Sequence, residues 1–258
     1  MPLLFPGDTV ADLPAPQKAN ATLKLGPGLI HTPPTTITAH KAGELVVDAR
    51  KHALWIESNS RRYIPYPQDA VVATILRSSA DAYICAIPSS TSPAPSSVQA
   101  TLPHLAFPNA TKKTRPIFHP GATVYARISL ANKHMDPELE CYDAETGKGS
   151  GFGELKGGMI FSISLGLARR LLGDGKKMLQ AATRAGEKWE GGSGVELLEE
   201  LGKSIAFECA IGRNGKAWVD SGDVATTLMI GRCLMASEGL TAEEVRTMVR
   251  AELKKTQG

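Results

Sequence analysis

Two apolar runs near the C-terminal end constrain the fold of this chain more than any other feature. Residues 205–211 and 216–219 are mostly apolar, and only Gly212-Arg213-Asn214-Gly215 separates them. Asn and Gly both tolerate φ > 0, which a tight hairpin turn requires. The spacing therefore predicts a β-hairpin, with Gly212, Asn214 and Gly215 as a structural turn and Trp218 in the strand that follows it.

The last third of the chain changes from strand to helix periodicity. A strand is expected at 159–164, and apolar residues three or four positions apart predict helices around 165–172, 195–201 and 224–235. Thr241-Ala242-Glu243-Glu244 has the spacing of a capping box, which predicts the start of a final helix. The element order β-α-α-β-β-α is that of a KH domain of the common eukaryotic type.

The preceding residues divide into two β-rich blocks, so the expected class is α+β multidomain. Residues 1–58 are rich in Pro, Thr and Gly and predict a small N-terminal β domain without a helix. Residues 59–147 contain about five strands, one of them a short piece near Thr101-Leu102, and have the size of a small OB-type barrel. Residues 148–258 form the KH-type domain. Residues 88–103 are expected to be a mobile insertion, and residues 173–194 an extra polar, helix-prone segment ending in a linker.

Positive charge is concentrated in the barrel block, although the whole chain has a net charge of only +3. Residues 59–135 contain eight cationic side chains and two aspartates: Arg61, Arg62, Arg77, Lys112, Lys113, Arg115, Arg127 and Lys133 against Asp69 and Asp81. Electrostatic steering depends on local charge, so this distribution favours a phosphate backbone as the partner.

Other function classes lack their signatures. No run approaches the roughly 20 apolar residues of a membrane span, and the first residues do not form a signal peptide, so no membrane partner is expected. The four cysteines are far apart and lie in apolar runs, which indicates buried reduced thiols and no metal site. Neither a Walker loop nor a dinucleotide fingerprint is present, so no cofactor is expected.

One feature of the sequence would support an enzymatic function. Asp136, Glu138 and Glu140 alternate and would project from one face of a strand. A two-metal nuclease draws its carboxylates from several elements, and Pro137 interrupts this ladder. No catalytic residue is therefore assigned.

Four motifs resemble the S1/KH cap subunits of the RNA exosome. They are residues 61–65, 112–116, 131–138 and 212–219. Among these subunits the chain is most similar to the ribosomal RNA-processing protein forty family, with the sister S1/KH subunit as the alternative. The resemblance implies a non-catalytic subunit that sits with other cap subunits on a ring of RNase PH-like proteins and guides single-stranded RNA into its channel for 3'-5' degradation and rRNA processing. It also implies a nuclear and nucleolar location, with a cytoplasmic fraction, and a turn at 212–215 that is buried against the barrel.

The basic loop of the barrel is the main candidate for RNA contact. Lys112, Lys113 and Arg115 lie within four residues, and OB barrels bind strands through such loops. The alternative is a solvated charge run. The weaker candidates are Phe107, Arg127, Lys133 and His134. A purely structural clamp also remains open, because the Pro-rich first block has little core of its own and suits a surface that becomes ordered on a partner.

Overall fold

The structure is a computed structural model in which the chain forms two compact units, Met1–Ser60 and Arg61–Gly258. It describes residues 3–10, 22–34, 36–48, 52–58, 62–89, 98–132, 134–143, 146–172 and 193–257. Residues 90–97 and 173–192 of the two expected extra segments lie outside this part of the chain, as does Lys133.

The first unit consists of short strands. Four of them form one sheet in the order β1 (Leu3–Leu4), β5 (Gly43–Asp48), β6 (Ala53–Glu57) and β2 (Lys24–Leu25). β3 (Leu29–Thr32) and β4 (Thr36–Ala39) form a separate antiparallel hairpin. The prediction of a small β domain is thus confirmed.

This unit also has a hydrophobic core, so the expectation that it has little core of its own is wrong. The buried cluster consists of Val10, Leu29, Ile37, Ala39, Leu45, Leu54 and Ile56. Three of these side chains come from the β3–β4 hairpin, which sequence analysis did not identify. Gly28 allows this hairpin to begin close to β6, because its φ is +91° and a Cβ there would lie 2.7 Å from the Cβ of Ile56.

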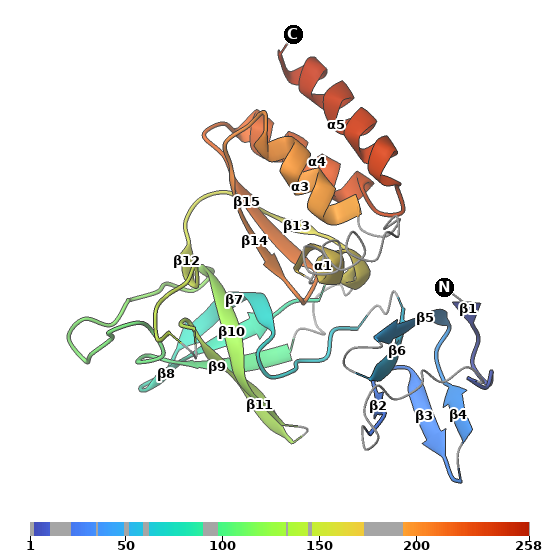
Figure 1. The fold of residues 1–258 in the computed structure, drawn as a ribbon. Coiled ribbons are helices and arrows are strands. Elements are labelled where there is room, and N and C mark those ends of the chain that lie inside the picture. The colour runs from blue at the N-terminus through green and yellow to red at the C-terminus, as the bar shows by residue number, and fades with distance from the viewer. Residues whose placement is uncertain are drawn as a thin grey trace. The chain divides into compact units, whose positions relative to one another are not determined.

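Five strands of the second unit close into a barrel (Figure 1). They are β7 (Ala70–Ser78), β8 (Ala82–Ile87), β9 (Val98–Pro103), β10 (Thr123–Asn132) and β11 (Met135–Glu140). Their order is β11-β9-β8-β7-β10, and β10 also pairs with β11, which completes the circle; a short strand, β12 (Gly153–Leu155), adds to β10. β9 and β11 are parallel, and the other pairs are antiparallel. The predicted OB-type barrel is confirmed.

β9 corrects the expected extent of the insertion. Its six residues were assigned to the mobile segment 88–103, although a short strand was expected near Thr101. The strand instead begins at Val98 and buries Ala100 and Leu102 in the barrel core. The Ser/Pro-rich composition of the preceding residues concealed the alternation of positions 98, 100 and 102.

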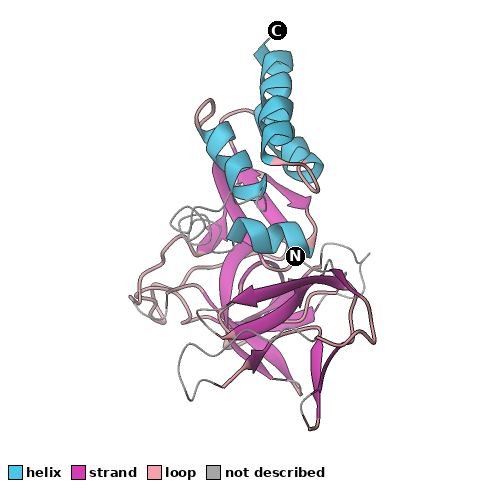
Figure 2. Cartoon of the chain, turned by 45° about the vertical axis from the view of Figure 1, so that its right-hand side comes forward, coloured by secondary structure: helices cyan, strands magenta, loops and turns pink. Residues whose placement is uncertain are grey.

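After the barrel, the described residues of the second unit form a three-stranded sheet and four helices (Figure 2). The sheet order is β13 (Met159–Ser162), β15 (Lys216–Asp220) and β14 (Glu208–Gly212). The helices are α1 (Leu165–Leu172), α3 (Ser193–Gly202), α4 (Val224–Ala236) and α5 (Ala242–Gln257). The predicted KH order is confirmed, and α5 is the final helix that was expected to start after Thr241. Ser193 and Gly194, expected in a linker, lie in the first turn of α3.

Helix α4 packs closely on the sheet at a glycine. It contacts β13 and β15, and a Cβ on Gly231 would lie 2.1 Å from the ring of Phe161 in β13. Asp223 caps the N-terminus of this helix, because its carboxylate accepts a hydrogen bond of 3.3 Å from the backbone N–H of Thr226. The apolar residues of these elements form a second buried core.

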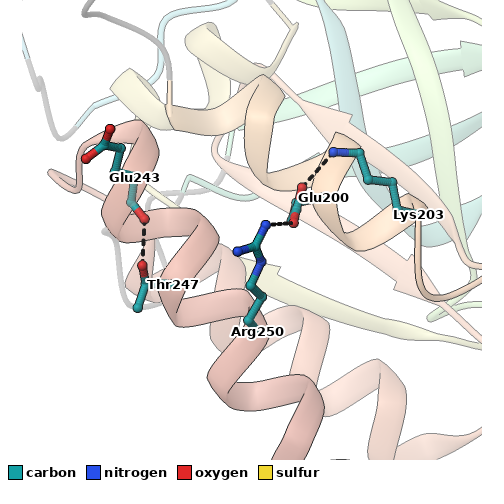
Figure 3. Close-up of polar contacts among 5 residues, drawn as sticks. All are labelled: Glu200, Lys203, Glu243, Thr247 and Arg250. Atoms are coloured by element: carbon teal, nitrogen blue, oxygen red, sulfur yellow. Dashed lines mark hydrogen bonds and ion pairs between the residues drawn. The ribbon is translucent and has the colours of Figure 1, made fainter.

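Helix α5 packs against α3, and polar contacts accompany the packing (Figure 3). Glu200 accepts a hydrogen bond of 2.7 Å from Lys203 and one of 3.4 Å from Arg250 of α5. The bond from Lys203 is the main reason that the pKa of Glu200 is lowered. One half of the predicted capping box is present, since the Glu244 carboxylate accepts from the backbone N–H of Thr241 at 2.8 Å; the Thr241 hydroxyl donates to the same carboxylate at 2.9 Å.

The cysteines agree with the expectation only in part. Cys85, Cys141 and Cys233 are buried, and burial raises the pKa of each thiol. Cys209 in β14 is exposed, so the prediction of burial is wrong for this residue. It lies near the start of the edge strand β14, whose first two residues are exposed and whose last three are buried.

Candidate nucleic-acid interface

The basic cluster lies in the loop that joins β9 to β10. Thr111 and Thr114 close a turn around the two lysines: the backbone N–H of Thr114 donates to the carbonyl of Thr111 at 3.1 Å, and their hydroxyls are 2.8 Å apart. The two threonines thus satisfy the polar groups of the turn locally. Lys112 and Lys113 at its centre are exposed, and within the described residues their side chains make no hydrogen bond or ion pair.

Aromatic residues of the barrel anchor both ends of this loop. The hydroxyl of Tyr83 donates to the carbonyl of Pro116 at 2.9 Å. The ring centroid of Phe118 lies 5.3 Å from that of Tyr83 and 5.5 Å from that of Phe107. The loop is therefore an exposed cationic turn on a fixed base.

Arg115 differs from the two lysines because its side chain has a partner in the barrel. Its Nη1 lies 2.6 Å from Nδ1 of His104, the residue that follows β9. Arg115 is itself exposed, and within the described residues its guanidinium has no other hydrogen bond or ion pair. Three cations are thus presented together, as the sequence predicted, but one of them is held in place.

Two of the weaker candidates are turned away from this surface. Phe107 is only 8% exposed and belongs to the barrel core, so a base cannot stack on its ring. Arg127 in β10 is buried, and its Nη2 donates to the carboxylate of Glu140 on β11. The expectation that these two side chains are available to RNA is corrected, because core packing and a buried ion pair already occupy them.

His134 lies at the other end of β10. The basic loop precedes the ten-residue strand β10, whereas His134 is exposed in the turn between β10 and β11. Ten residues of strand extend over roughly 30 Å. The structure thus does not bring His134 into the cluster of Lys112, Lys113 and Arg115.

The three alternating carboxylates considered for an enzymatic function do not form one cluster. Asp136 is exposed, Glu138 is half-buried, and Glu140 is buried in its ion pair with Arg127. Among the described residues, no group of three or more His, Cys, Asp or Glu side chains could hold a metal ion. Nor does any described helix have the length and apolar character needed to cross a membrane.

The turn between β14 and β15 packs on the barrel. Asn214 is completely buried: its side-chain Oδ1 accepts from the backbone N–H of Val72 at 3.2 Å, and its Nδ2 donates to the carbonyls of Val72 and Pro88 at 2.9 and 2.7 Å. Gly215 has a φ of +75°. The side chain of Asn214 therefore joins the KH-type sheet to strand β7 of the barrel.

Further polar contacts surround this joint. The backbone N–H of Arg213 donates to the carbonyl of Ala70 at 2.8 Å, and its half-exposed side chain forms an ion pair of 3.5 Å with Asp69. Asp69 also accepts a hydrogen bond of 2.8 Å from Tyr63. Burial raises the pKa of Asp69, while the bond from Tyr63 and the charge of Arg213 oppose that shift. Arg213 thus has a structural partner.

Trp218 lies in β15, the central strand of the same sheet. Its indole N–H donates to the carbonyl of Gly157 at 2.9 Å. Gly158 has a φ of +62°, and a Cβ there would lie 2.8 Å from the indole nitrogen. The backbone at position 158 can therefore approach the Trp218 ring this closely only with glycine.

His104 is not among the site residues predicted from the sequence. A signal for it exists, because positions 98, 100, 102 and 104 continue one alternation of strand β9. Ala100 and Leu102 lie in the barrel core, and His104, in the turn just after β9, is also buried and contacts Arg115 of the basic loop. The interpretation of residues 88–103 as an insertion hid this pattern.

A closed OB-type barrel joined to a KH-type domain, with an exposed basic loop, defines a multidomain protein built from nucleic-acid-binding folds. Three family models match the chain in this order: "Exosome complex exonuclease Rrp40 N-terminal domain" over residues 23–62, "Exosome complex component RRP40, S1 domain" over residues 63–153, and "KH domain" over residues 158–225.

Relatives along most of the chain agree with these matches. Exosome complex component rrp40 of Schizosaccharomyces pombe is 38% identical over 93% of this chain and 90% of its own length. Exosome complex component RRP40 of Saccharomyces cerevisiae is 34% identical over 90% of this chain and 87% of its own length. This chain therefore belongs to the family of exosome complex component RRP40, and its predicted family is confirmed.

A solved structure shares the fold. A crystal structure of a protein assigned as an exosome complex RNA-binding protein superposes with a TM-score of 0.52, covering 75% of this chain and 98% of the other. The two sequences are 16% identical, so the likeness concerns the fold alone.

Proposed function

We propose that this chain is a non-catalytic cap subunit of the RNA exosome, which guides single-stranded RNA into the complex for 3'-5' degradation and rRNA processing. The loop of Lys112, Lys113 and Arg115 is its RNA contact. The observation that carries this proposal is the local geometry of the loop: three cations are exposed on a turn whose own polar groups are already satisfied.

The chemistry of this surface favours phosphate over bases. Ammonium and guanidinium groups bind phosphate oxygens, which carry no sequence information. The aromatic side chains next to the loop, Phe107, Phe118 and Tyr83, are buried and do not offer a stacking face. Binding at this site should therefore be independent of RNA sequence and strongly dependent on salt.

Charge reversal of the loop tests this function. In the complex assembled with this chain, replacing Lys112, Lys113 and Arg115 by Glu should weaken binding of a labelled oligouridylate. It should also reduce the magnitude of the slope of log affinity against log salt by about 2, since three phosphate contacts are lost and each contributes about 0.7 on a single strand. Superimposable binding curves of variant and wild type would remove the loop from the RNA path and favour the purely structural clamp.

A matched control separates loop contacts from net charge. Arg232, Arg246 and Lys254 are exposed on α4 and α5, and their side chains have no polar partner within the described residues. Their replacement by Glu changes the net charge by the same amount. This control should retain the wild-type salt slope.

The proposed partners are the RNase PH-like ring subunits and the other cap subunits, in the nucleus and nucleolus and also in the cytoplasm. Membership of the RRP40 family supports this assignment, because relatives in two yeasts are named as exosome complex components. Purification of a tagged copy, followed by identification of the proteins that accompany it, tests the partners. Recovery of the chain alone under gentle conditions would contradict the assignment.

The absence of catalysis is part of the proposal. Its support is the dispersal of Asp136, Glu138 and Glu140 over exposed, half-buried and buried positions. The purified chain, incubated with labelled RNA and magnesium, with and without phosphate, should leave the RNA intact. Degradation that co-purifies with the protein and disappears in Asp136→Asn or Glu138→Gln would overturn it.

A further inference from the structure

His104 lies beneath the basic loop and has a polar contact at each ring nitrogen. The residue is only 4% exposed, and its ring packs 4.4 Å from that of Tyr83. Nδ1 lies 2.6 Å from Nη1 of Arg115, and Nε2 lies 3.5 Å from Oγ of Ser78. A buried imidazole thus connects the barrel wall to one cation of the loop.

The chemistry of these partners determines the protonation of His104. A guanidinium has donors only, so Nδ1 must be the acceptor and the ring must be neutral, with its proton on Nε2. That proton points to Ser78, whose hydroxyl donates in turn to the carbonyl of Ser79 at 3.3 Å. The hydrogen bonds therefore run in one consistent direction, from Arg115 through His104 and Ser78 to the backbone.

The charges around His104 favour the same neutral form. Burial lowers the pKa of this imidazole, and the charge of Arg115 lowers it further, whereas Asp81 in the β7–β8 turn opposes these effects. Tyr83 and Ser78 face the ring without a charge. At neutral pH the acceptor on Nδ1 is thus present.

Arg115 is consequently ordered before any ligand arrives. One of its five N–H donors is committed to His104, and the others remain for a phosphate. Lys112 and Lys113 have no such partner among the described residues, so they must lose side-chain freedom when they bind. The three cations of the loop are therefore not equivalent.

We propose that His104 is a positioning residue, which holds the guanidinium of Arg115 in place to receive a backbone phosphate of single-stranded RNA. This role rests on the proposed function of the loop. It divides the loop into one preorganised guanidinium and two flexible ammonium groups.

A double-mutant cycle tests the coupling between the two residues. His104→Phe keeps a ring beside Tyr83 and removes the acceptor, and it should weaken oligouridylate binding by the assembled complex on the order of fivefold, the cost of ordering one long side chain on binding. Arg115→Gln should weaken binding less in the His104→Phe background than in the wild type. The matched control Lys113→Gln should have the same effect in both backgrounds. Equal effects of Arg115→Gln in both backgrounds would overturn the proposal.

A conservative variant distinguishes positioning from packing. His104→Asn places a carbonyl oxygen close to the position of Nδ1, so it should bind RNA better than His104→Phe although it fills less volume. A ranking in the reverse order, with both variants folded, would mean that ring packing and not the acceptor supports the loop.

Measurements on the wild-type chain remain decisive if His104→Phe does not fold. Nitrogen chemical shifts of the imidazole should identify the neutral ring with its proton on Nε2, and Arg115→Gln should raise the pKa of His104 because a neighbouring positive charge is removed. A proton on Nδ1, or a pKa that does not respond to Arg115→Gln, would overturn the proposal.

The triple Glu variant of the loop, included in the same binding assay, distinguishes a failure of the proposed function from a failure of the positioning role alone. If it binds RNA as the wild type does, the loop is not the RNA contact, and the positioning role fails together with the proposed function. If it loses binding while His104→Phe and Arg115→Gln are additive, the proposed function stands and only the positioning role fails.

Discussion

Two short polar turns of the second unit look alike in sequence and differ in what they can do. The Thr111–Thr114 turn and the Gly212–Gly215 turn both carry cations and turn-forming residues. The first satisfies its polar groups within itself and leaves two lysines exposed. The second buries Asn214, which makes three hydrogen bonds to the backbone of the barrel segment. The location of its hydrogen-bond partners thus decides whether a polar turn is a surface or a joint.

Asn214→Ala should have the largest effect on stability. It leaves the buried N–H and C=O groups of Val72 and the half-buried C=O group of Pro88 without their partners, which should lower the free energy of unfolding by about 3 kcal/mol. For a chain of this size, the thermal midpoint should fall by roughly 6–12 °C. RNA affinity of the variant that remains folded at low temperature should be unchanged.

Arg213→Gln is the matched control for this joint. Its side chain is 43% exposed and pairs with Asp69 at 3.5 Å, so solvent screens the loss. The thermal midpoint should change little. If Arg213→Gln destabilises the protein as much as Asn214→Ala, the ion pair and not the buried amide holds the joint together.

Gly215→Ala should have a smaller effect of the same kind. An alanine at a φ of +75° is strained by about 1 kcal/mol or more. Gly202 at the end of α3 has open space for a Cβ and no positive φ, so Gly202→Ala serves as the control and should not destabilise. An unchanged melting temperature of Gly215→Ala together with weaker RNA binding would contradict the structural role of this turn.

The sequence predicted the elements that have a clear local residue pattern. It missed the short strands that are defined by packing against distant parts of the chain. The hairpin at 208–220, the capping box at Thr241 and the five-stranded barrel all follow from local patterns. The β3–β4 hairpin and the start of β9 were missed, because short strands next to Pro-rich segments have little pattern of their own. Their apolar side chains become core residues only when other strands cover them.

The candidate site divides in the same way. Local charge density identified Lys112, Lys113 and Arg115, and the structure exposes all three. Charge and aromatic character also suggested Arg127 and Phe107, but the partners that bury them, Glu140 and Phe118, are residues that no spacing rule connects to them. The contact of Arg115 with His104 depends on the path of the loop back to the end of β9, which the sequence does not specify.

Charge reversal in the basic loop should affect stability less than either change in the buried turn. Exposed loop cations contribute little to folding, so the free energy of unfolding of the Lys112, Lys113 and Arg115 triple Glu variant should stay within about 1 kcal/mol of the wild type. Denaturant unfolding measures this difference. A larger loss would show that the loop is part of the barrel's structural framework and would remove the contrast between the two turns.

The smallest expected effect is a pH dependence that comes from His104 alone. Its pKa in the folded protein is lowered, whereas in the unfolded chain it should be close to the ordinary 6.5. Well above pH 6.5 both states are neutral at this position, and the histidine adds no pH dependence. As the pH falls below 6.5, the unfolded chain takes up the proton first, so the free energy of unfolding should decrease until the folded imidazole is protonated as well.

The difference between wild type and His104→Phe isolates this effect, because Asp69 and the other titrating groups are present in both. We expect the stability of the wild type relative to His104→Phe to be constant above about pH 7 and to decrease between pH 6.5 and the lowered pKa. Urea unfolding at a series of pH values measures the difference. If it is constant, or if the wild type gains relative stability in acid, then His104 is protonated or unpaired in the folded protein, and Arg115 is no better ordered than the two lysines beside it.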